Sequence, residues 1–186
     1  MTTRPAPSLM TAEEFVLFDG EDGYRYDLID GTLMRMAAAG RRHGRIAVRF
    51  STPLSLFVEE RNLGEVYAAE TGFILARNPD VVLAPDVSFV RAERLTVDVD
   101  DDGFLPLAPD FAVEVISPSE RAGKIRTEVR TYLEAGVPLL VLVYPHRRQV
   151  TVHRRDGSGE VLDETAVLDG GDVLPGFRLS VAALFR

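Results

Sequence analysis

Two uninterrupted apolar runs, separated by one helix-length segment, constrain the fold of this chain more than any other feature. The runs are FAVEVI at 111–116 and LLVLVY at 139–144, and strands that are apolar on both faces belong to sheets covered on both sides. Between them, Ser117 and Glu120 form a capping-box pattern with Pro118 at the first helical position. A glycine and a proline then act as stop signals. Strand, helix and strand with so short a return predict parallel pairing of the two strands.

The rest of the chain alternates helix and strand signals. Thr11 and Glu14 form a capping box that opens a short helix, and Asp30-Gly31 is typical of a hairpin turn. Further expected elements are a helix from about 43 to 62 that Pro53 should kink or divide, strands at about 65–75 and 81–90, a hairpin at 149–165 around Asp156-Gly157, and a short terminal helix near 181–185. The predicted fold class is therefore α/β, with a mixed central β-sheet flanked by helices. We expect a single domain over 1–186, of which 1–10 form a flexible N-terminal segment.

Composition excludes several functional classes. The chain has no cysteine, which removes disulfides, thiolate zinc sites and cysteine nucleophiles and agrees with a reducing cytoplasm. No apolar window approaches the roughly 20 residues of a membrane span, so we expect a cytoplasmic protein without a membrane partner.

The net charge of −8 argues against a nucleic-acid partner. However, six arginines lie between 34 and 61 while acid is concentrated at 98–102, which indicates either a local basic face or a merely solubilising set of arginines.

Glu114 is a carboxylate in the middle of the first apolar run and requires a partner. Burying even an uncharged polar group without one costs about 2 to 7 kcal/mol. The chain has three Pro-Asp dipeptides, ending at Asp80, Asp86 and Asp110. Asp86 lies within the strand-like VVLAPDVSFV, which could pair beside the Glu114 strand, and two converging carboxylates form a site for Mg²⁺. The alternatives are a buried salt bridge from Glu114 to an arginine and a turn aspartate at Asp86.

The motifs of this chain, taken in order, resemble the Uma family of bacterial restriction endonuclease-like proteins, a branch of the PD-(D/E)XK nuclease superfamily. They are YDLIDG, RRHGR, AETGF, APDVSFV, APDFAVEVISPS, LEAGV and VLPGF, and they extend over roughly 11–185. The resemblance implies a restriction endonuclease-like core and hydrolysis of phosphodiester bonds that depends on Mg²⁺ or Mn²⁺. It assigns metal binding to Asp86 and Glu114, and to Asp27 as an additional acid where relatives usually carry Glu.

The catalytic lysine of the family is missing from its usual places. In relatives it often lies on the following helix, four residues before the aromatic residue of a Y-x-x-x-G-V motif, and here that position holds Glu128. Lys124, the only lysine of the chain, lies one turn earlier on the same helical face and is a candidate for the role. The alternative is an ordinary solvated lysine paired with Glu128. A carboxylate can also orient or deprotonate water, so the candidate catalytic residues are Asp86, Glu114, Lys124 and Glu128.

The predicted nucleic-acid-binding residues are Arg41, Arg42, His43 and Arg45, whose positive side chains suit phosphate contacts. His43 either contacts a phosphate or a metal-bound water, or only caps or packs the second helix. The resulting prediction is a metal-dependent endonuclease acting on nucleic acid, with DNA as the expected substrate and a homodimer as one assembly to consider. Two alternatives stay open: a degenerate nuclease fold that binds nucleic acid or protein without catalysis, and a metal-dependent hydrolase of small phosphorylated compounds.

Overall fold

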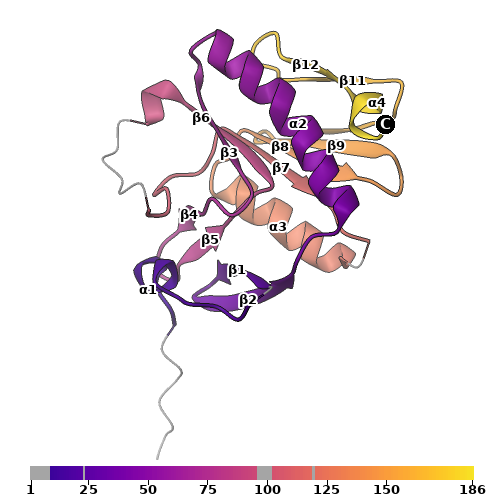
Figure 1. Cartoon of the computed structure of the whole chain (residues 1–186). Helices are drawn as coiled ribbons and strands as arrows, with labels where there is room; N and C mark the ends of the chain where they lie inside the picture. Colours follow the sequence, from indigo (N-terminus) through magenta and orange to yellow (C-terminus); the bar gives the residue numbers. More distant parts are fainter. Residues whose placement is uncertain (1–8, 23, 96–101, 119) are drawn as a thin grey trace, which may run out of the picture.

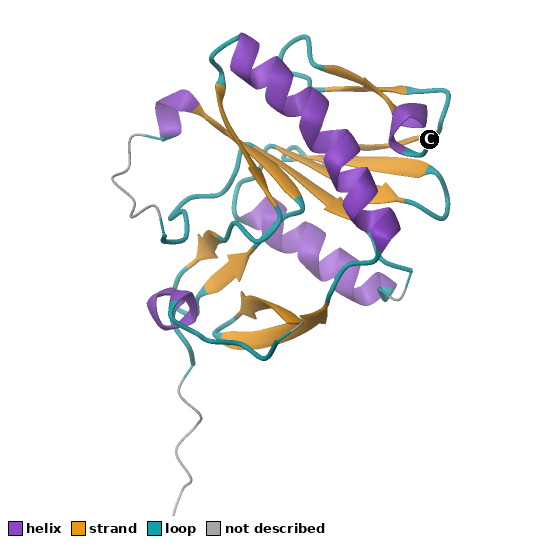
Figure 2. Ribbon diagram, in the orientation of Figure 1, coloured by secondary structure: helices purple, strands orange, loops and turns teal. Residues whose placement is uncertain are grey.

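A six-stranded mixed sheet covered on both faces by helices forms the centre of the computed structural model (Figures 1 and 2). The structure describes residues 9–22, 24–95, 102–118 and 120–186. The strand order is β10-β9-β8-β7-β6-β3. The bounds are β3 Gly64–Ala68, β6 Val87–Arg91, β7 Phe111–Val115, β8 Leu139–Tyr144, β9 Gln149–Arg154 and β10 Gly159–Leu162, with α2 at Arg41–Glu60 and α3 at Ala122–Glu134.

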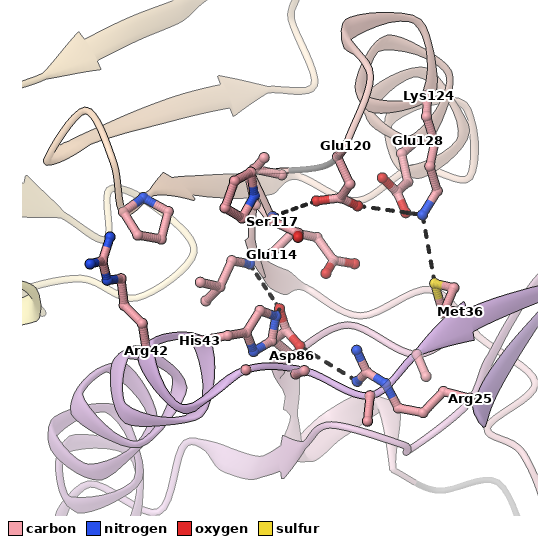
Figure 3. Close-up of a pocket in the computed structure, with 18 of the residues that line it drawn as sticks. Arg25, Met36, Arg42, His43, Asp86, Glu114, Ser117, Glu120, Lys124 and Glu128 are labelled. Atoms are coloured by element: carbon pink, nitrogen blue, oxygen red, sulfur yellow. Dashed lines mark hydrogen bonds and ion pairs between the residues drawn. The ribbon is translucent and has the colours of Figure 1, made fainter. Parts of the chain in front are cut away.

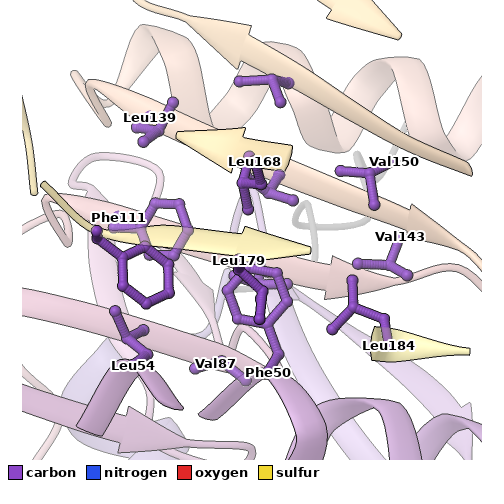
Figure 4. Packing of buried hydrophobic residues seen from close by; sticks show 14 of the residues in the cluster. Phe50, Leu54, Val87, Phe111, Leu139, Val143, Val150, Leu168, Leu179 and Leu184 are labelled. Carbon is purple, nitrogen blue, oxygen red and sulfur yellow. The ribbon is translucent and has the colours of Figure 1, made fainter. Parts of the chain in front are cut away.

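Strands β7 and β8 are parallel neighbours, with Glu114 in register with Leu142, so the predicted strand–helix–strand unit is confirmed. The odd-numbered residues of β7 pack toward α2 in the largest core, part of which Figure 4 shows around Phe111. Ala112 packs in a separate cluster with Tyr132 of α3. Because side chains alternate along a strand, Glu114 points to the same face as Ala112, toward α3.

Helix α2 presents one apolar stripe to this sheet through Ile46, Phe50, Leu54 and Val58. These residues recur every four positions, which places them on one face of a helix. Pro53 was expected to kink or divide the helix, and the division does not occur, because α2 runs through Pro53 without a break. A proline inside a helix removes one hydrogen bond and costs about 3 kcal/mol, and the burial of four large side chains offsets that cost.

A second sheet of four strands, in the order β2-β1-β5-β4, lies against the α3 side of the molecule. Its bounds are β1 Tyr24–Ile29, β2 Thr32–Ala37, β4 Phe73–Ala76 and β5 Val81–Leu83. The hairpin predicted at Asp30-Gly31 joins β1 to β2, and both turn residues adopt positive φ angles of 49° and 68°.

The chain passes from the second sheet to the first between β5 and β6, through residues 84–86. The continuous strand predicted at 81–90 is therefore wrong, since a proline without an N–H interrupts the ladder there. The strand predicted at 65–75 is likewise divided, because a turn at 69–72 separates β3 from β4. Asp86 thus lies at the point where the two sheets meet.

Helix α3 begins one turn later than predicted, at Ala122 with Arg121 as its N-cap. The Ser117 N–H does donate to the Glu120 carboxylate at 2.6 Å, but the segment forms only a turn, in which the Glu120 N–H donates to the Ser117 carbonyl. The predicted start of this helix at Pro118 is therefore wrong. Its end is as predicted, with Gly136 at φ 91° just after the last turn.

The remaining elements flank these two sheets. Helix α1 (Ala12–Val16) carries the predicted capping box between Thr11 and Glu14, and η1 is a short 3-10 helix at Ala92–Arg94. The hairpin predicted around Asp156-Gly157 is formed by β9 and β10. A small sheet of β11 (Val167–Asp169) and β12 (Arg178–Ser180) leads into α4 (Val181–Leu184), the predicted terminal helix, and packs onto the α2 core.

The structure does not test two of the predictions about chain ends and charge. The segment expected to be flexible, 1–10, falls mostly on 1–8, and the acidic run at 98–102 falls mostly on 96–101; both lie outside the described residues. Within the described part, the Met10 N–H donates to the Gly31 carbonyl at 2.9 Å. None of the described helices has the length and apolar character needed to cross a bilayer.

Candidate active site

A cavity of about 650 Å³ opens where β7 ends, between the two sheets and the first turns of α2 and α3 (Figure 3). Eight of the nine residues predicted from the sequence as site residues line it: Asp27, Arg41, Arg42, His43, Asp86, Glu114, Lys124 and Glu128. They come from β1, the β5–β6 junction, β7 and both long helices. The fold thus places residues that are far apart in the sequence around one cavity. Of the nine predicted site residues, Arg45 alone does not line it.

Asp86 is almost completely buried, at 4% exposure, and three contacts fix its carboxylate in place. Its Oδ2 accepts a hydrogen bond from the Val115 N–H at 2.8 Å, and the His43 Nε2 lies 2.9 Å from the same oxygen. The Arg25 guanidinium lies 3.8 Å from Oδ1. Asp86 is therefore more than a turn residue, because its carboxylate joins β7, α2 and β1.

Glu114 has a tyrosine as its partner. The buried Tyr132 hydroxyl on α3 donates to Glu114 Oε1 at 2.6 Å. Among the described residues no arginine pairs with Glu114, so the alternative of a buried arginine salt bridge is wrong. Burial raises the pKa of Glu114 well above its ordinary value, and the nearby charges of Asp86 and Glu128 raise it further. The hydrogen bond from Tyr132 opposes this increase by stabilising the ionised form.

Two more carboxylates in the cavity, Asp27 and Glu128, also have raised pKa values. Burial raises the pKa of Asp27 to about 6, although Lys124 and Arg25 act to lower it. Burial also raises the pKa of Glu128 to about 7, against the lowering effect of Lys124. Near neutral pH the cavity thus concentrates carboxylates whose ionisation is costly, which favours a bound cation.

Lys124 reaches the cavity, but its contacts differ from those expected of a lysine directed at the two strand acids. Its Nζ lies 3.4 Å from Glu120 and 3.8 Å from Glu128, and it contacts the Met36 sulfur at 3.6 Å (Figure 3). Burial acts to lower the pKa of Lys124, but the carboxylates of Glu128 and Glu120 outweigh it and the pKa is raised. The ammonium is therefore charged and pairs with Glu128 on its own helix and with Glu120 in the turn that precedes the helix.

Several polar side chains at the site, Glu120 and His146 among them, were not identified from the sequence as site residues. Arg25 and Arg35, from the β1–β2 hairpin, line the cavity, and Tyr132 holds Glu114. Two of them carried a usable signal. Arg25 lies two residues before Asp27 and so shares its face of the strand. A buried tyrosine hydroxyl needs a polar partner, and Glu114 on the strand beneath α3 is the obvious one.

Asp86 and Glu114 are the carboxylates of the cavity that a metal ion would use as ligands. Among the described residues there is no group of three or more His, Cys, Asp or Glu side chains arranged to hold an ion. Val115 and His43 occupy Asp86 Oδ2, whereas Oδ1 has, in the described part of the chain, only the Arg25 guanidinium at 3.8 Å. Glu114 uses Oε1 for Tyr132 and keeps Oε2, so each carboxylate has one oxygen that can serve as a ligand. Magnesium is commonly bound through one or two carboxylates together with retained water, so this donor set fits a magnesium ion that is largely hydrated.

Comparison with known proteins agrees with this fold. The chain matches the model of the Uma2 family, described as "Putative restriction endonuclease", over residues 12–182. No curated protein was found to match it. Among solved structures, it is similar to one described as "a putative nuclease belonging to DUF820", from Anabaena variabilis ATCC 29413, with a TM-score of 0.79 and 20% identity over 95% of this chain and 97% of that chain. At this identity the structural likeness shows the fold alone, and it confirms the predicted fold class.

Proposed function

Because the chain belongs to the Uma2 family, whose description is "Putative restriction endonuclease", we propose that it is a metal-dependent endonuclease that hydrolyses phosphodiester bonds of nucleic acid, and of DNA in particular. The observation that carries this proposal is the meeting of Asp86, Glu114 and Lys124 in one cavity with arginines at its rim. An acidic centre suits a cation, and a basic rim suits the phosphates on either side of the bond to be cut.

Magnesium or manganese is the proposed cofactor. Asp86 and Glu114 would hold it, and Asp27 would contribute through a water or a second ion. When bound, such an ion polarises a phosphate oxygen and lowers the pKa of the attacking water. The support is the charge balance of the cavity, because the raised pKa values of Glu114 and Asp27 indicate anions that lack sufficient compensation.

The protein's own groups have separate roles in this proposal. Glu128, whose burial raises its pKa to about 7, can accept a proton from water near neutral pH, since a general base works best when its pKa is close to the working pH. Lys124 provides a positive charge for the phosphate that is attacked. Arg41 and Arg42 on α2 and Arg25 on β1 line the same cavity, where they bind flanking phosphates.

The second candidate function is a catalytically degenerate module that binds nucleic acid. One observation favours it: the Lys124 ammonium is already paired with two carboxylates, Glu128 on the same helix and Glu120 in the turn before it. The two functions differ in turnover, because a binding module retains affinity for nucleic acid without cutting it. In both cases we propose a cytoplasmic setting, supported by the absence of cysteine, and sedimentation would show whether the protein is a homodimer.

The experiment that tests the proposal is a cleavage assay on a substrate panel. Supercoiled plasmid, linear duplex, single-stranded DNA and RNA are incubated with Mg²⁺, with Mn²⁺ or with EDTA, using Asp86→Ala as the control. We expect duplex DNA to be cut with either metal, EDTA to stop the reaction, and the control to be inactive. Binding without cleavage of every substrate would overturn the proposal in favour of the binding module, and preferred cleavage of RNA would correct the substrate.

A further inference from the structure

A second hollow, of about 280 Å³, lies beside the cavity and shares Arg42, Pro145 and His146 with it. Its polar lining consists of Arg42 and Arg45 from α2 and of His146 and Arg148 from the turn between β8 and β9. No aspartate or glutamate side chain lines it among the residues that the structure describes. The buried side chains of Ile46 and Leu184 contribute an apolar wall. Positive groups from two separate elements thus face one space without acidic neighbours in its lining.

His146 presents a hydrogen-bond donor to this hollow. The Arg42 guanidinium lies 3.4 Å from His146 Nδ1. A guanidinium can only donate, so Nδ1 acts as the acceptor and the ring hydrogen is on Nε2. An imidazole in this tautomer offers its Nε2–H to a ligand, alongside the N–H groups of Arg42. The pair is therefore suited to an acceptor with several oxygens.

Arg45 and Arg148 differ in how much of their charge is available. Arg148 binds the Glu164 carboxylate through Nε and Nη2 and donates to the Phe185 carbonyl at 3.2 Å, so most of its charge is neutralised and its position is fixed. Arg45 is exposed and has no ion-pair partner in the described part of the chain. Arg45 is therefore the cation of this hollow that a ligand can recruit without breaking an existing pair.

We propose that the hollow binds a backbone phosphate of the nucleic-acid strand that leaves the cavity, with Arg45 and His146 as its contacts and Arg42 as the link between the two spaces. This inference rests on the proposed function, because the continuity with the active-site cavity identifies the anion as part of the substrate. The polar side chains of the lining are exposed, which suits a salt-sensitive phosphodiester contact better than tight capture of a single free anion.

The test compares Arg45→Gln with Arg61→Gln in binding of a DNA duplex, measured by fluorescence anisotropy over a range of salt concentrations in EDTA. Arg61 follows the opposite end of α2, about 24 Å away at 1.5 Å per residue, and is the matched control. Arg45→Gln should weaken binding about tenfold at low salt and reduce the slope of log affinity against log salt by about 0.9, the value for one phosphate contact. Arg61→Gln should leave both unchanged.

His146→Ala provides a second variant if Arg45→Gln fails to fold, and it should weaken binding about threefold through the loss of the imidazole N–H donor. Inorganic phosphate is added as a separate probe at constant ionic strength. Equal effects of Arg45→Gln and Arg61→Gln would overturn the proposal, as would phosphate binding that depends on Arg45 while duplex binding does not. Because no cleavage is needed, a protein that binds duplex through Arg45 but cuts nothing overturns only the proposed function.

Discussion

Replacing Tyr132 with phenylalanine removes a single hydroxyl from the interior of the candidate active site. That hydroxyl is the hydrogen-bond donor to Glu114, at 2.6 Å, and the tyrosine ring is fully buried in the cluster between α3 and the sheet. Phenylalanine keeps the ring and therefore the packing. The substitution thus changes the electrostatics of Glu114 and little else.

The size of the effect follows from the type of bond that is lost. A hydrogen bond to a charged group contributes about 1.5 to 3 kcal/mol, which corresponds to roughly a 10- to 150-fold change in an equilibrium constant. The Tyr132 hydroxyl lowers the pKa of Glu114, so its removal raises that pKa further and reduces the ionised fraction near neutral pH. We expect the half-saturating magnesium concentration for DNA cleavage to rise by about 10-fold or more at pH 7, and the difference from wild type to shrink at pH 9.

Tyr67→Phe is the matched control. The Tyr67 hydroxyl donates to Glu65 at the same distance of 2.6 Å, but neither residue lines the cavity. Magnesium titrations of plasmid nicking at pH 7 and pH 9 are compared for wild type and both variants. The reasoning is refuted if both variants behave alike, or if the loss in Tyr132→Phe is the same at both pH values.

Three further predictions concern the charged groups of the cavity. Lys124→Ala should reduce the cleavage rate by about 10² under saturating magnesium, and by more than Glu128→Ala does. Lys124→Arg should restore little of the rate. A larger loss in Glu128→Ala than in Lys124→Ala would show that Glu128, and not Lys124, is the more important catalytic group. Unfolding free energy should fall as pH rises from about 4 to about 7, because the raised pKa values of Asp27, about 6, and Glu128, about 7, mean that the folded state holds protons which the unfolded state releases. The loss is on the order of 3 kcal/mol for each group over this range, and urea denaturation at intervals from pH 4 to pH 8 would measure it; a flat profile contradicts the assignment. Glu114→Gln should raise the melting temperature at pH 8 while abolishing cleavage, since it removes a buried charge; a lower melting temperature would contradict this.

The parts of the fold that depend on local signals could be predicted from the sequence. The parallel pairing of β7 and β8 followed from two apolar runs joined by a short return, and the β1–β2 hairpin from Asp30-Gly31. The start of α3 could not be predicted, because Ser117 and Glu120 form a hydrogen-bonded turn that resembles a capping box without leading directly into a helix. The division at Pro85-Asp86 was also missed. Pro85 is a local sign that the ladder is interrupted, but nothing local shows that the segments on either side of it join different sheets.

The acids that line the candidate site could be predicted from the sequence more readily than the side chains that contact those acids. A charge within an apolar strand marked Glu114, and the neighbouring strand-like segment selected Asp86 from three similar dipeptides. The aspartates of the other two dipeptides stabilise the fold. Asp80 accepts a hydrogen bond from the Ala12 N–H and pairs with Arg77, and Asp110 pairs with Arg94. Partners such as His43 on Asp86 depend on how distant elements pack together, which periodicity within one segment cannot show.

The role of Asp86 in metal-dependent cleavage is tested by the rate at which the protein nicks supercoiled DNA in magnesium, compared between Asp86→Asn and Asp80→Asn. Both aspartates follow a proline and both are buried, at 4% and 7% exposure, but only Asp86 lines the cavity. With folding of each variant verified by thermal unfolding, we predict cleavage by wild type and by Asp80→Asn and a loss of about 10² or more in Asp86→Asn. Equal rates in the two variants, or no metal-dependent cleavage by the wild-type protein, would contradict the account.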